Sequence, residues 1–147
     1  MNVVRKFLDG FRWKGVEVLD YKPAGTHFRS ISRQVLFDGP GELDAQLRYF
    51  AIEPGGHSTL ERHTHTHAVM ILNGRGRGLV ENRVYDLAPF DLVSVPPGCW
   101  HQFRAAPDAP LGFLCLVSTC RDRPQRPTPS QLAQLRENPE LAAFIRT

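Results

Sequence analysis

The stretch "LERHTHTHAVMILNGRGRG", residues 60–78, decides how the whole sequence is interpreted. It places three of the chain's six histidines at alternate positions, His63, His65 and His67, and Glu61 stands two residues before the first of them. Imidazole and carboxylate groups in such a cluster are typical ligands of transition metals. They also occur on polar strands that bind no ion, so the cluster has to be weighed with the rest of the chain.

The spacing of these side chains suits a single ion. Side chains at positions i and i+2 of a β-strand point to the same face, so Glu61 and His63 can reach the same point. A tight hairpin through residues 64–66 would place His67 opposite His63, at the start of the apolar strand 67–74. Two imidazoles and one carboxylate would then converge on the inner face of a sheet.

A further imidazole comes from "VPPGCWHQF", residues 95–103, where a proline–glycine turn precedes His101. Taken alone, His101 could equally be a hydrogen-bonded core histidine. Beside the other three side chains it is a candidate ligand, because three imidazoles and one carboxylate suit Mn, Fe, Co, Ni, Cu or Zn. We therefore expect one divalent transition metal ion.

Short strands without intervening helices dominate the 147 residues, which is the length of one domain. Alternating or continuous apolar residues, separated by Gly, Pro and Asp, indicate an all-β sandwich or barrel. Thr128 before Pro129 and Asn138 before Pro139 predict two short C-terminal helices. The candidate strands cover residues 15–21, 29–37, 42–53, 58–63, 67–74, 76–81, 83–87, 90–96, 100–105 and 111–118.

Two motifs in this chain resemble those of the cupin superfamily. The first family motif, G-x5-H-x-H-x3-4-E-x6-G, has the spacing of Gly55, Glu61, His63, His67 and Gly74. The second, G-x5-P-x-G-x2-H-x3-N, has the spacing that here reads Phe90, Pro96, Gly98, His101 and Ala105. The resemblance implies a cupin jelly-roll β-barrel with the metal ligands Glu61, His63, His67 and His101.

The departures from the family pattern leave the ligand inventory unchanged. Glu61 stands where the family has its first histidine, and His67 stands where it has its glutamate. Phe90 and Ala105 replace a turn glycine and an asparagine that carry no ligand. The motif spacing also places His65 in the turn near solvent, outside the ligand set. If the strand instead stays straight past His63, His65 shares its face and is an alternative ligand. A barrel that keeps these polar residues without an ion remains the alternative, although burying them unpaired is costly.

The resemblance divides the chain into three parts of one domain. We expect N-terminal strands over residues 1–39 that pack on or extend the barrel, the barrel over residues 40–118, and a helical tail over residues 119–147. Inside the barrel, the predicted substrate pocket comprises Arg48, Phe50, Val69, Ile71, Phe103 and Cys115. Arg48 would hold a carboxylate or phosphate there; an outward-facing Arg48 and a purely structural Cys115 are the alternatives.

Composition limits the partners. The net charge of +3 is spread along the chain, and the densest group, Arg121, Arg123 and Arg126, is diluted by Asp122, so no nucleic-acid partner is expected. No apolar run is long enough for a membrane span, and the N-terminus does not resemble a signal peptide. The odd number of cysteines, 3, indicates reduced thiols and a cytoplasmic protein.

Family resemblance implies an enzyme that acts on a small oxygen-rich or carboxylate-bearing molecule, of the dioxygenase, isomerase, decarboxylase or hydrolase type. The alternative is a module that binds or senses a small ligand without turning it over. Met70, Leu72 and Trp100 lie on strand faces opposite the metal ligands. These apolar side chains need cover, which predicts a homodimer.

Overall fold

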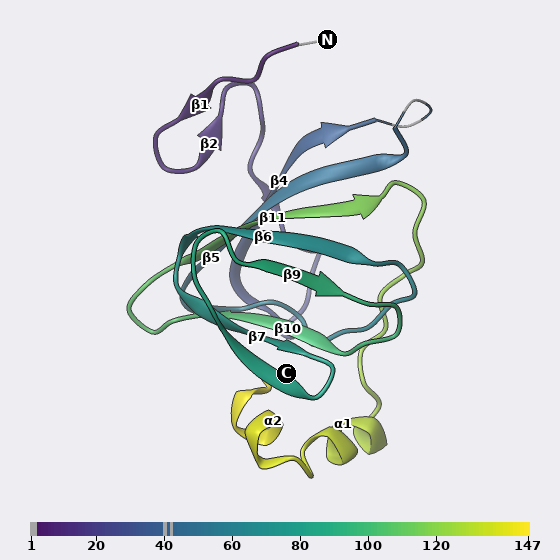
Figure 1. The fold of residues 1–147 in the computed structure, drawn as a ribbon. Helices are drawn as coiled ribbons and strands as arrows, with labels where there is room; N and C mark the ends of the chain where they lie inside the picture. The colour runs from purple at the N-terminus through teal and green to yellow at the C-terminus, as the bar shows by residue number, and fades with distance from the viewer. Residues whose placement is uncertain (1–2, 40, 42) are drawn as a thin grey trace.

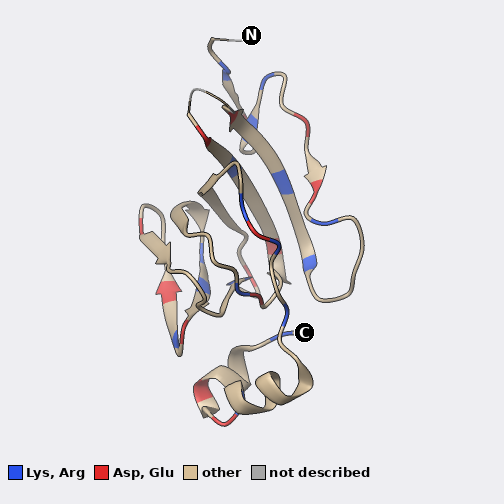
Figure 2. Cartoon of the chain, turned by 90° about the vertical axis from the view of Figure 1, so that its right-hand side faces the viewer, with Lys and Arg blue, Asp and Glu red and all other residues tan. Residues whose placement is uncertain are grey.

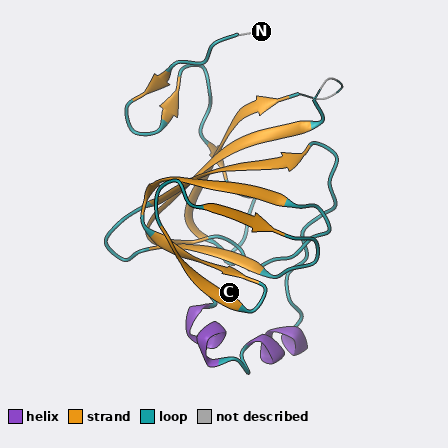
Figure 3. Ribbon diagram, viewed as in Figure 1, coloured by secondary structure: helices purple, strands orange, loops and turns teal. Residues whose placement is uncertain are grey.

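The computed structural model describes residues 3–39, 41 and 43–147, and it is built from β-strands followed by two short helices (Figures 1 and 3). The all-β barrel predicted from the sequence is confirmed. The elements are β1 (Phe7–Leu8), β2 (Arg12–Trp13), β3 (Leu19–Asp20), β4 (Arg29–Asp38), β5 (Ala45–His57), β6 (His67–Gly74), β7 (Gly76–Val80), β8 (Arg83–Leu87), β9 (Leu92–Val95), β10 (His101–Ala105), β11 (Leu111–Ser118), α1 (Pro129–Leu135) and α2 (Pro139–Phe144).

The long strand β5 joins the two halves of the barrel. The strand order of the main sheet is β8-β7-β10-β5-β11-β6-β9, and β4 also pairs with β5. Most of β5 lies between β4 and β11, whereas its last residue, His57, pairs with Arg104 of β10. The bend falls at Gly55, which has a φ of +77°, and at Gly56, where a Cβ would lie 2.6 Å from the Arg29 carbonyl oxygen. One strand therefore serves two layers, and the sheet curls around its core.

The interior of the barrel is filled by alternate residues of these strands. Phe50 stacks on Phe113 with ring centroids 5.4 Å apart, and Phe103 lies 4.8 Å from Phe113. The core cluster consists of Phe50, Ile52, Val69, Ile71, Leu87, Phe103, Ala105, Leu111, Phe113, Cys115 and Val117. Inward-facing apolar residues thus form the core of the barrel.

The segment 58–63, predicted as a strand, makes only two isolated bridges, Glu61 with His101 and Arg62 with Gln125. Its first residue explains the difference. The Ser58 hydroxyl accepts a hydrogen bond from the Phe103 amide at 2.8 Å, and the Ser58 amide donates to the Phe103 carbonyl at 2.9 Å. A serine that bonds to a neighbouring backbone in this way competes with a regular strand ladder.

The N-terminal part also differs from the expectation. Only Leu19–Asp20 of the predicted strand 15–21 is paired, and a small hairpin of β1 and β2 precedes it (Figure 1). Its aromatic side chains pack on the barrel: Phe11 stacks on Tyr49 of β5 at 5.7 Å, and Trp13 lies 5.3 Å from the same ring. Tertiary packing of aromatic rings therefore holds a hairpin too short to be recognised from strand periodicity.

The two predicted helices are confirmed, with their caps. The Thr128 hydroxyl accepts from the Gln131 amide at 3.2 Å, and the Asn138 side chain accepts from the Glu140 amide at 3.0 Å. Neither helix is long and apolar enough to cross a membrane, and the same holds for all described residues. Leu141, Phe144 and Ile145 are buried in a second apolar cluster, together with Leu60 and Leu79, and Trp100, Leu132 and Leu135 pack against it.

Hydrogen bonds connect the helical tail to side chains of β10. The Gln102 side-chain amide donates to the Arg146 carbonyl at 2.7 Å and its oxygen accepts from the Arg146 amide at 3.0 Å. The Arg104 guanidinium donates to the Phe144 carbonyl at 2.7 Å. The tail thus holds the strand that begins with His101. It also packs against Trp100, one of the apolar side chains from which the sequence predicted a homodimer.

Candidate metal centre

Three of the predicted ligands come together at one end of the barrel interior. A nitrogen atom of each of His63, His67 and His101 lies within 4.8 Å of the corresponding atoms of the other two. His101 opens β10 and His67 opens β6. The backbone of Glu61 exchanges two hydrogen bonds with that of His101, at 3.0 and 3.2 Å, which fixes the preceding segment beside β10. Residues distant in sequence are therefore held together by main-chain pairing.

Backbone carbonyls set the tautomers of two of these histidines. Nδ1 of His63 lies 2.7 Å from the carbonyl oxygen of His65, and Nδ1 of His101 lies 3.1 Å from that of Cys99. A carbonyl oxygen can only accept, so Nδ1 carries the proton and a neutral ring keeps its lone pair on Nε2. Metal-ligating histidines commonly show this arrangement. Nε2 of His63 is buried and has no hydrogen-bond partner among the described residues.

The environment keeps the three rings in the neutral form that binds metal. Burial lowers the pKa of His63 from 6.5 to about 4. Burial, and then the charge of His101, lower the pKa of His67, and burial lowers the pKa of His101. The three histidines thus fit, and could hold, a divalent transition metal ion.

His65 lies closer to this group than the sequence predicted. It is in the turn, but its side chain is only 8% exposed, so its expected position near solvent is wrong. The ring stacks on that of His63 at 3.6 Å, and its Nε2 lies 3.2 Å from Nε2 of His67. The cause is Asp122, which accepts hydrogen bonds from Nδ1 of His65 at 2.7 Å and from the amides of Thr64 and His65. These bonds hold the pKa of the Asp122 carboxyl well below its usual range.

Glu61 lies beside the histidines without joining the group that they form. It is 7% exposed, and its Oε2 accepts from Nζ of Lys22 at 2.5 Å. Lys22 belongs to the loop between β3 and β4, and it lines the same cavity as His67 and His101. The carboxylate is thus balanced by a lysine, and its part in metal binding remains a prediction.

A cavity of about 180 Å³ opens beside the histidines. Four of the six predicted pocket residues line it: Arg48, Phe50, Phe103 and Cys115. Val69 and Ile71 are fully buried in the core cluster instead. The lining residues are Tyr21, Lys22, Arg33, Arg48, Phe50, Ser58, Thr59, Glu61, His65, His67, His101, Phe103, Phe113, Cys115, Arg121 and Pro124.

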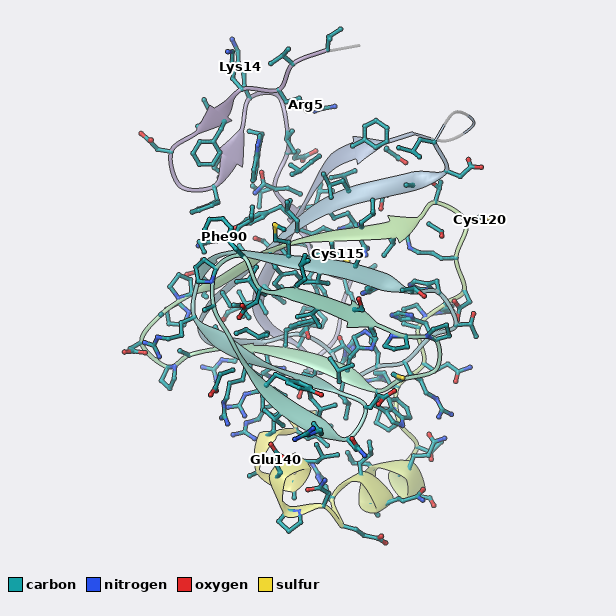
Figure 4. All side chains as sticks on the ribbon, viewed as in Figure 1. Arg5, Lys14, Phe90, Cys115, Cys120 and Glu140 are labelled. Carbon is teal, nitrogen blue, oxygen red and sulfur yellow. The ribbon has the colours of Figure 1, made fainter. Side chains whose placement is uncertain are left out.

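Arg48 and Cys115 are cross-strand neighbours on β5 and β11, and both line the cavity. Arg48 is 9% exposed and therefore points inward, its guanidinium lies 5.0 Å from the Phe50 ring, and it donates to Sγ of Cys115 at 3.5 Å. Burial raises the pKa of the Cys115 thiol. Figure 4 shows Cys115 among the strands of the barrel, whereas Cys120 lies at its outer edge.

Several lining residues were missed from the sequence. Arg33 stands two residues after Ile31 and two residues before Val35 on β4. Side chains at this spacing share one face of a strand, so the period of two could have placed Arg33 on the inner face. Lys22 and Arg121 lie in loops, where no periodicity indicates which way a side chain points. Their positions depend on contacts with distant strands and are visible only in the folded chain.

The chain is similar in sequence to known proteins. Residues 48–117 match the sequence model of a family described as "Cupin domain". A protein of Rhodospirillum rubrum named 1-methylthio-D-xylulose 5-phosphate methylsulfurylase is 55% identical over 142 residues, which cover 96% of this chain and 90% of that protein.

Two solved structures are similar along almost the whole chain. A cupin 2 conserved barrel domain protein from Rhodopseudomonas palustris is 50% identical with a TM-score of 0.93, covering 98% of this chain and 99% of that one. A cupin-2 domain protein from Rhodospirillum rubrum is 55% identical with a TM-score of 0.87, covering 96% of this chain and 95% of that one.

Proposed function

Because the chain belongs to the cupin domain family, we propose that it is a metal-dependent cupin enzyme that removes the methylthio group from 1-methylthio-D-xylulose 5-phosphate or a closely similar thioether sugar phosphate. The observation that carries the proposal is the three-histidine group beside a cavity lined by charged and aromatic side chains, in a chain 55% identical along nearly its full length to a protein named for that compound. Such a substrate is small and rich in oxygen, as the sequence led us to expect.

His63, His67 and His101 would hold one divalent transition metal ion, with Glu61 as the fourth ligand. A bound ion of this kind supplies Lewis acidity, which polarises a ketone and stabilises negative charge on its oxygen. The carbonyls of His65 and Cys99 keep two of the imidazoles oriented for that role. The ion pair with Lys22 holds the Glu61 carboxylate in place.

The wall of the cavity suits the rest of the molecule. Phe50, Phe103 and Phe113 form a contiguous aromatic surface beside the histidines. Thioether sulfur makes favourable contacts with aromatic rings, so this surface can seat the methylthio group and exclude water from it. The cavity volume of about 180 Å³ is below the roughly 300–1,000 Å³ of pockets for drug-sized ligands, which favours a small substrate.

The test is conversion of the compound itself. Protein purified without metal-chelate chromatography would be incubated with 1-methylthio-D-xylulose 5-phosphate and a low-molecular-weight thiol as co-substrate. The thiol sulfur would bond to the methylthio sulfur as the carbon–sulfur bond breaks, the carbon would keep the electron pair and take up the thiol proton, and the products would be a methyl disulfide and the 1-deoxy sugar phosphate. Proton NMR would follow the S-methyl signal. We expect the signal of the substrate to disappear, chelator to stop the reaction, and added metal to restore it.

The control is the 55% identical Rhodospirillum rubrum protein under the same conditions. Conversion by that protein, without conversion by the metal-loaded protein described here, would contradict the proposal. If the compound then bound tightly and was recovered unchanged, the chain would instead be the non-catalytic binding module that the sequence left open.

A further inference from the structure

Three guanidinium groups border the cavity without a carboxylate partner. Arg33, Arg48 and Arg121 all line it, yet none of them takes part in an ion pair among the described residues. The only acidic side chain in the lining, Glu61, is engaged by Lys22. The cavity therefore carries an excess of positive charge that the protein does not itself neutralise.

The sheet brings two of these arginines to the same inner face. Arg33 of β4 is in register with Phe50 of β5, and Arg48 of β5 is in register with Val35 of β4. Arg33 and Arg48 are thus diagonal neighbours, close enough for long side chains to approach the same point. Figure 2 shows basic positions on the long strands and on the segment that leads from the sheet to the helices.

Arg121 approaches from that segment, just after β11. Its guanidinium donates to the Ser118 carbonyl at 2.9 Å and to the side-chain oxygen of Gln46 at 3.3 Å. Gln46 precedes Arg48 by two residues on β5, so its side chain lies on the same face. These neutral acceptors fix the position of Arg121 without pairing its charge.

Buried donors without acceptors show that the protein alone does not satisfy this cluster. Nε of Arg33 and Nε of Arg48 are both buried and lack a hydrogen-bond partner among the described residues. Among the described residues, the side chain of Arg48 makes a single hydrogen bond, the weak one to Sγ of Cys115. Buried charge without pairing is strongly destabilising, and an anion with several oxygens would offset it.

From this arrangement we propose that Arg33, Arg48 and Arg121 form an anion subsite that binds the phosphate group of the substrate. The assignment rests on the proposed function for the identity of the compound, but the cluster itself indicates a phosphate monoester. A phosphate carries close to two negative charges and three terminal oxygens, which match several guanidinium donors. A carboxylate would neutralise a smaller part of the excess charge.

The same geometry orients the substrate. Arg48 lines the same cavity as His67 and His101, and its guanidinium lies 5.0 Å from the Phe50 ring in the cavity wall. A phosphate at the arginines would leave the opposite end of a short sugar chain beside His67 and His101. The methylthio-bearing carbon of a pentulose 5-phosphate is at that opposite end.

The experiment uses metal-loaded protein and a matched pair of probes, D-xylulose 5-phosphate and D-xylulose, measured by titration calorimetry. We expect the phosphorylated probe to bind far more tightly than D-xylulose. Arg33→Gln and Arg121→Gln should each weaken binding of D-xylulose 5-phosphate at least about tenfold, as expected for loss of a charge-assisted hydrogen bond. Binding of D-xylulose should not change. The matched control is Arg83→Gln, because Arg83 is exposed on β8 and outside the cavity.

Because Arg48 is buried, Arg48→Lys is the variant of choice there, and its melting temperature and metal content would be compared with those of the wild type. A lysine keeps the positive charge but cannot form the bidentate hydrogen bonds of a guanidinium group. Weaker phosphate binding with unchanged metal content in Arg48→Lys therefore supports the subsite. Equal affinity of the wild type for both probes would overturn it, as would Arg33→Gln and Arg121→Gln variants that bind D-xylulose 5-phosphate normally.

Turnover of the methylthio compound separates this inference from the proposed function. Arginine-dependent binding of D-xylulose 5-phosphate without turnover would leave the anion subsite standing and remove the proposed reaction. Turnover whose KM is unchanged in Arg33→Gln and Arg121→Gln would keep the reaction and overturn the subsite.

Discussion

Nδ1 of His63 lies 2.7 Å from the main-chain carbonyl oxygen of His65, while the two imidazole rings stack at a centroid distance of 3.6 Å. The hydrogen bond fixes the tautomer of His63 through the backbone of the turn and not through the side chain of His65. That side chain is tied to Asp122, at 2.7 Å. The turn therefore orients one candidate ligand and places a fourth imidazole beside the group.

Glu61 is predicted to contribute to metal affinity. Glu61→Gln removes the charge but keeps the size of the side chain, and we expect the metal dissociation constant to rise about tenfold or more, since a charged ligand is lost. Competition with a fluorescent chelator measures this constant. The matched control is Glu81→Gln, because Glu81 is exposed and only accepts from Sγ of Cys99. Unchanged affinity in Glu61→Gln would leave Glu61 only as the partner of Lys22.

The stability of metal-free protein should fall as the pH is lowered from about 6.5 to about 4. Burial lowers the pKa of His63 from 6.5 to about 4, and the pKa values of His67 and His101 are also lowered. In that window the unfolded chain binds protons that the folded chain does not, so the free energy of unfolding decreases with falling pH. Melting curves in chelator would measure the decrease, and His63→Gln should make it smaller.

The same pKa shifts set the pH at which metal is lost. Metal at a hundred times its dissociation constant should add roughly 2.7 kcal/mol to the free energy of unfolding. Because the folded rings stay neutral below pH 6.5, the melting-temperature difference between metal-loaded and chelator-treated protein should persist at pH 5.5 and disappear near pH 4. A difference already lost at pH 6 would mean that the ligands titrate with ordinary histidine pKa values.

Leu141 should be important for stability without being part of the site. It is 2% exposed in the cluster between the helices and the sheet, so Leu141→Ala should lower the free energy of unfolding by about 2–5 kcal/mol. Denaturant titration would show this, while metal content stays at the wild-type level. Leu43→Ala is the control, since Leu43 is 59% exposed and lies outside the helical tail. A loss below 1 kcal/mol in Leu141→Ala would mean that the tail adds little to the barrel.

The outer face of β6, β9 and β11 remains the basis for the predicted homodimer. Met70 is in register with Leu92 and with Leu114, and Leu116 is 45% exposed beside them. Trp100 gives the prediction less support, because it packs in part against the cluster that the chain's own helices form. Light scattering at tens of micromolar should give the mass of a dimer, and Leu116→Lys should shift it toward the monomer. A wild-type monomer would contradict the prediction.

Much of the fold follows from local rules that the sequence carries. Alternation of apolar and polar residues indicated the strands around the core. A Thr or Asn before a proline indicated where both helices begin. Both signals act within a few residues, so the sequence alone reveals them. The motif spacing likewise indicated His63, His67 and His101. Such patterns specify where a side chain stands in an element, and the barrel then brings the elements together.

The remaining features depend on long-range contacts. The β1–β2 hairpin is held by packing on Tyr49, and the orientation of His65 is set by Asp122, far along the chain. Lys22 and Arg121 reach the cavity from loops, where backbone conformation follows tertiary contacts. No local pattern encodes these placements.

Metal content per chain, measured by elemental analysis after purification without metal-chelate chromatography, tests the central claim most directly. We predict close to one transition metal ion per chain in the wild type, strong loss in His63→Ala and His101→Ala, and retention of most of the metal in His65→Ala, because that variant keeps the carbonyl that orients His63. Wild-type protein without stoichiometric metal, even after incubation with Mn, Fe, Co, Ni, Cu or Zn salts, would contradict the metal centre. Equal loss in His65→Ala and His63→Ala would contradict the assignment of its ligands.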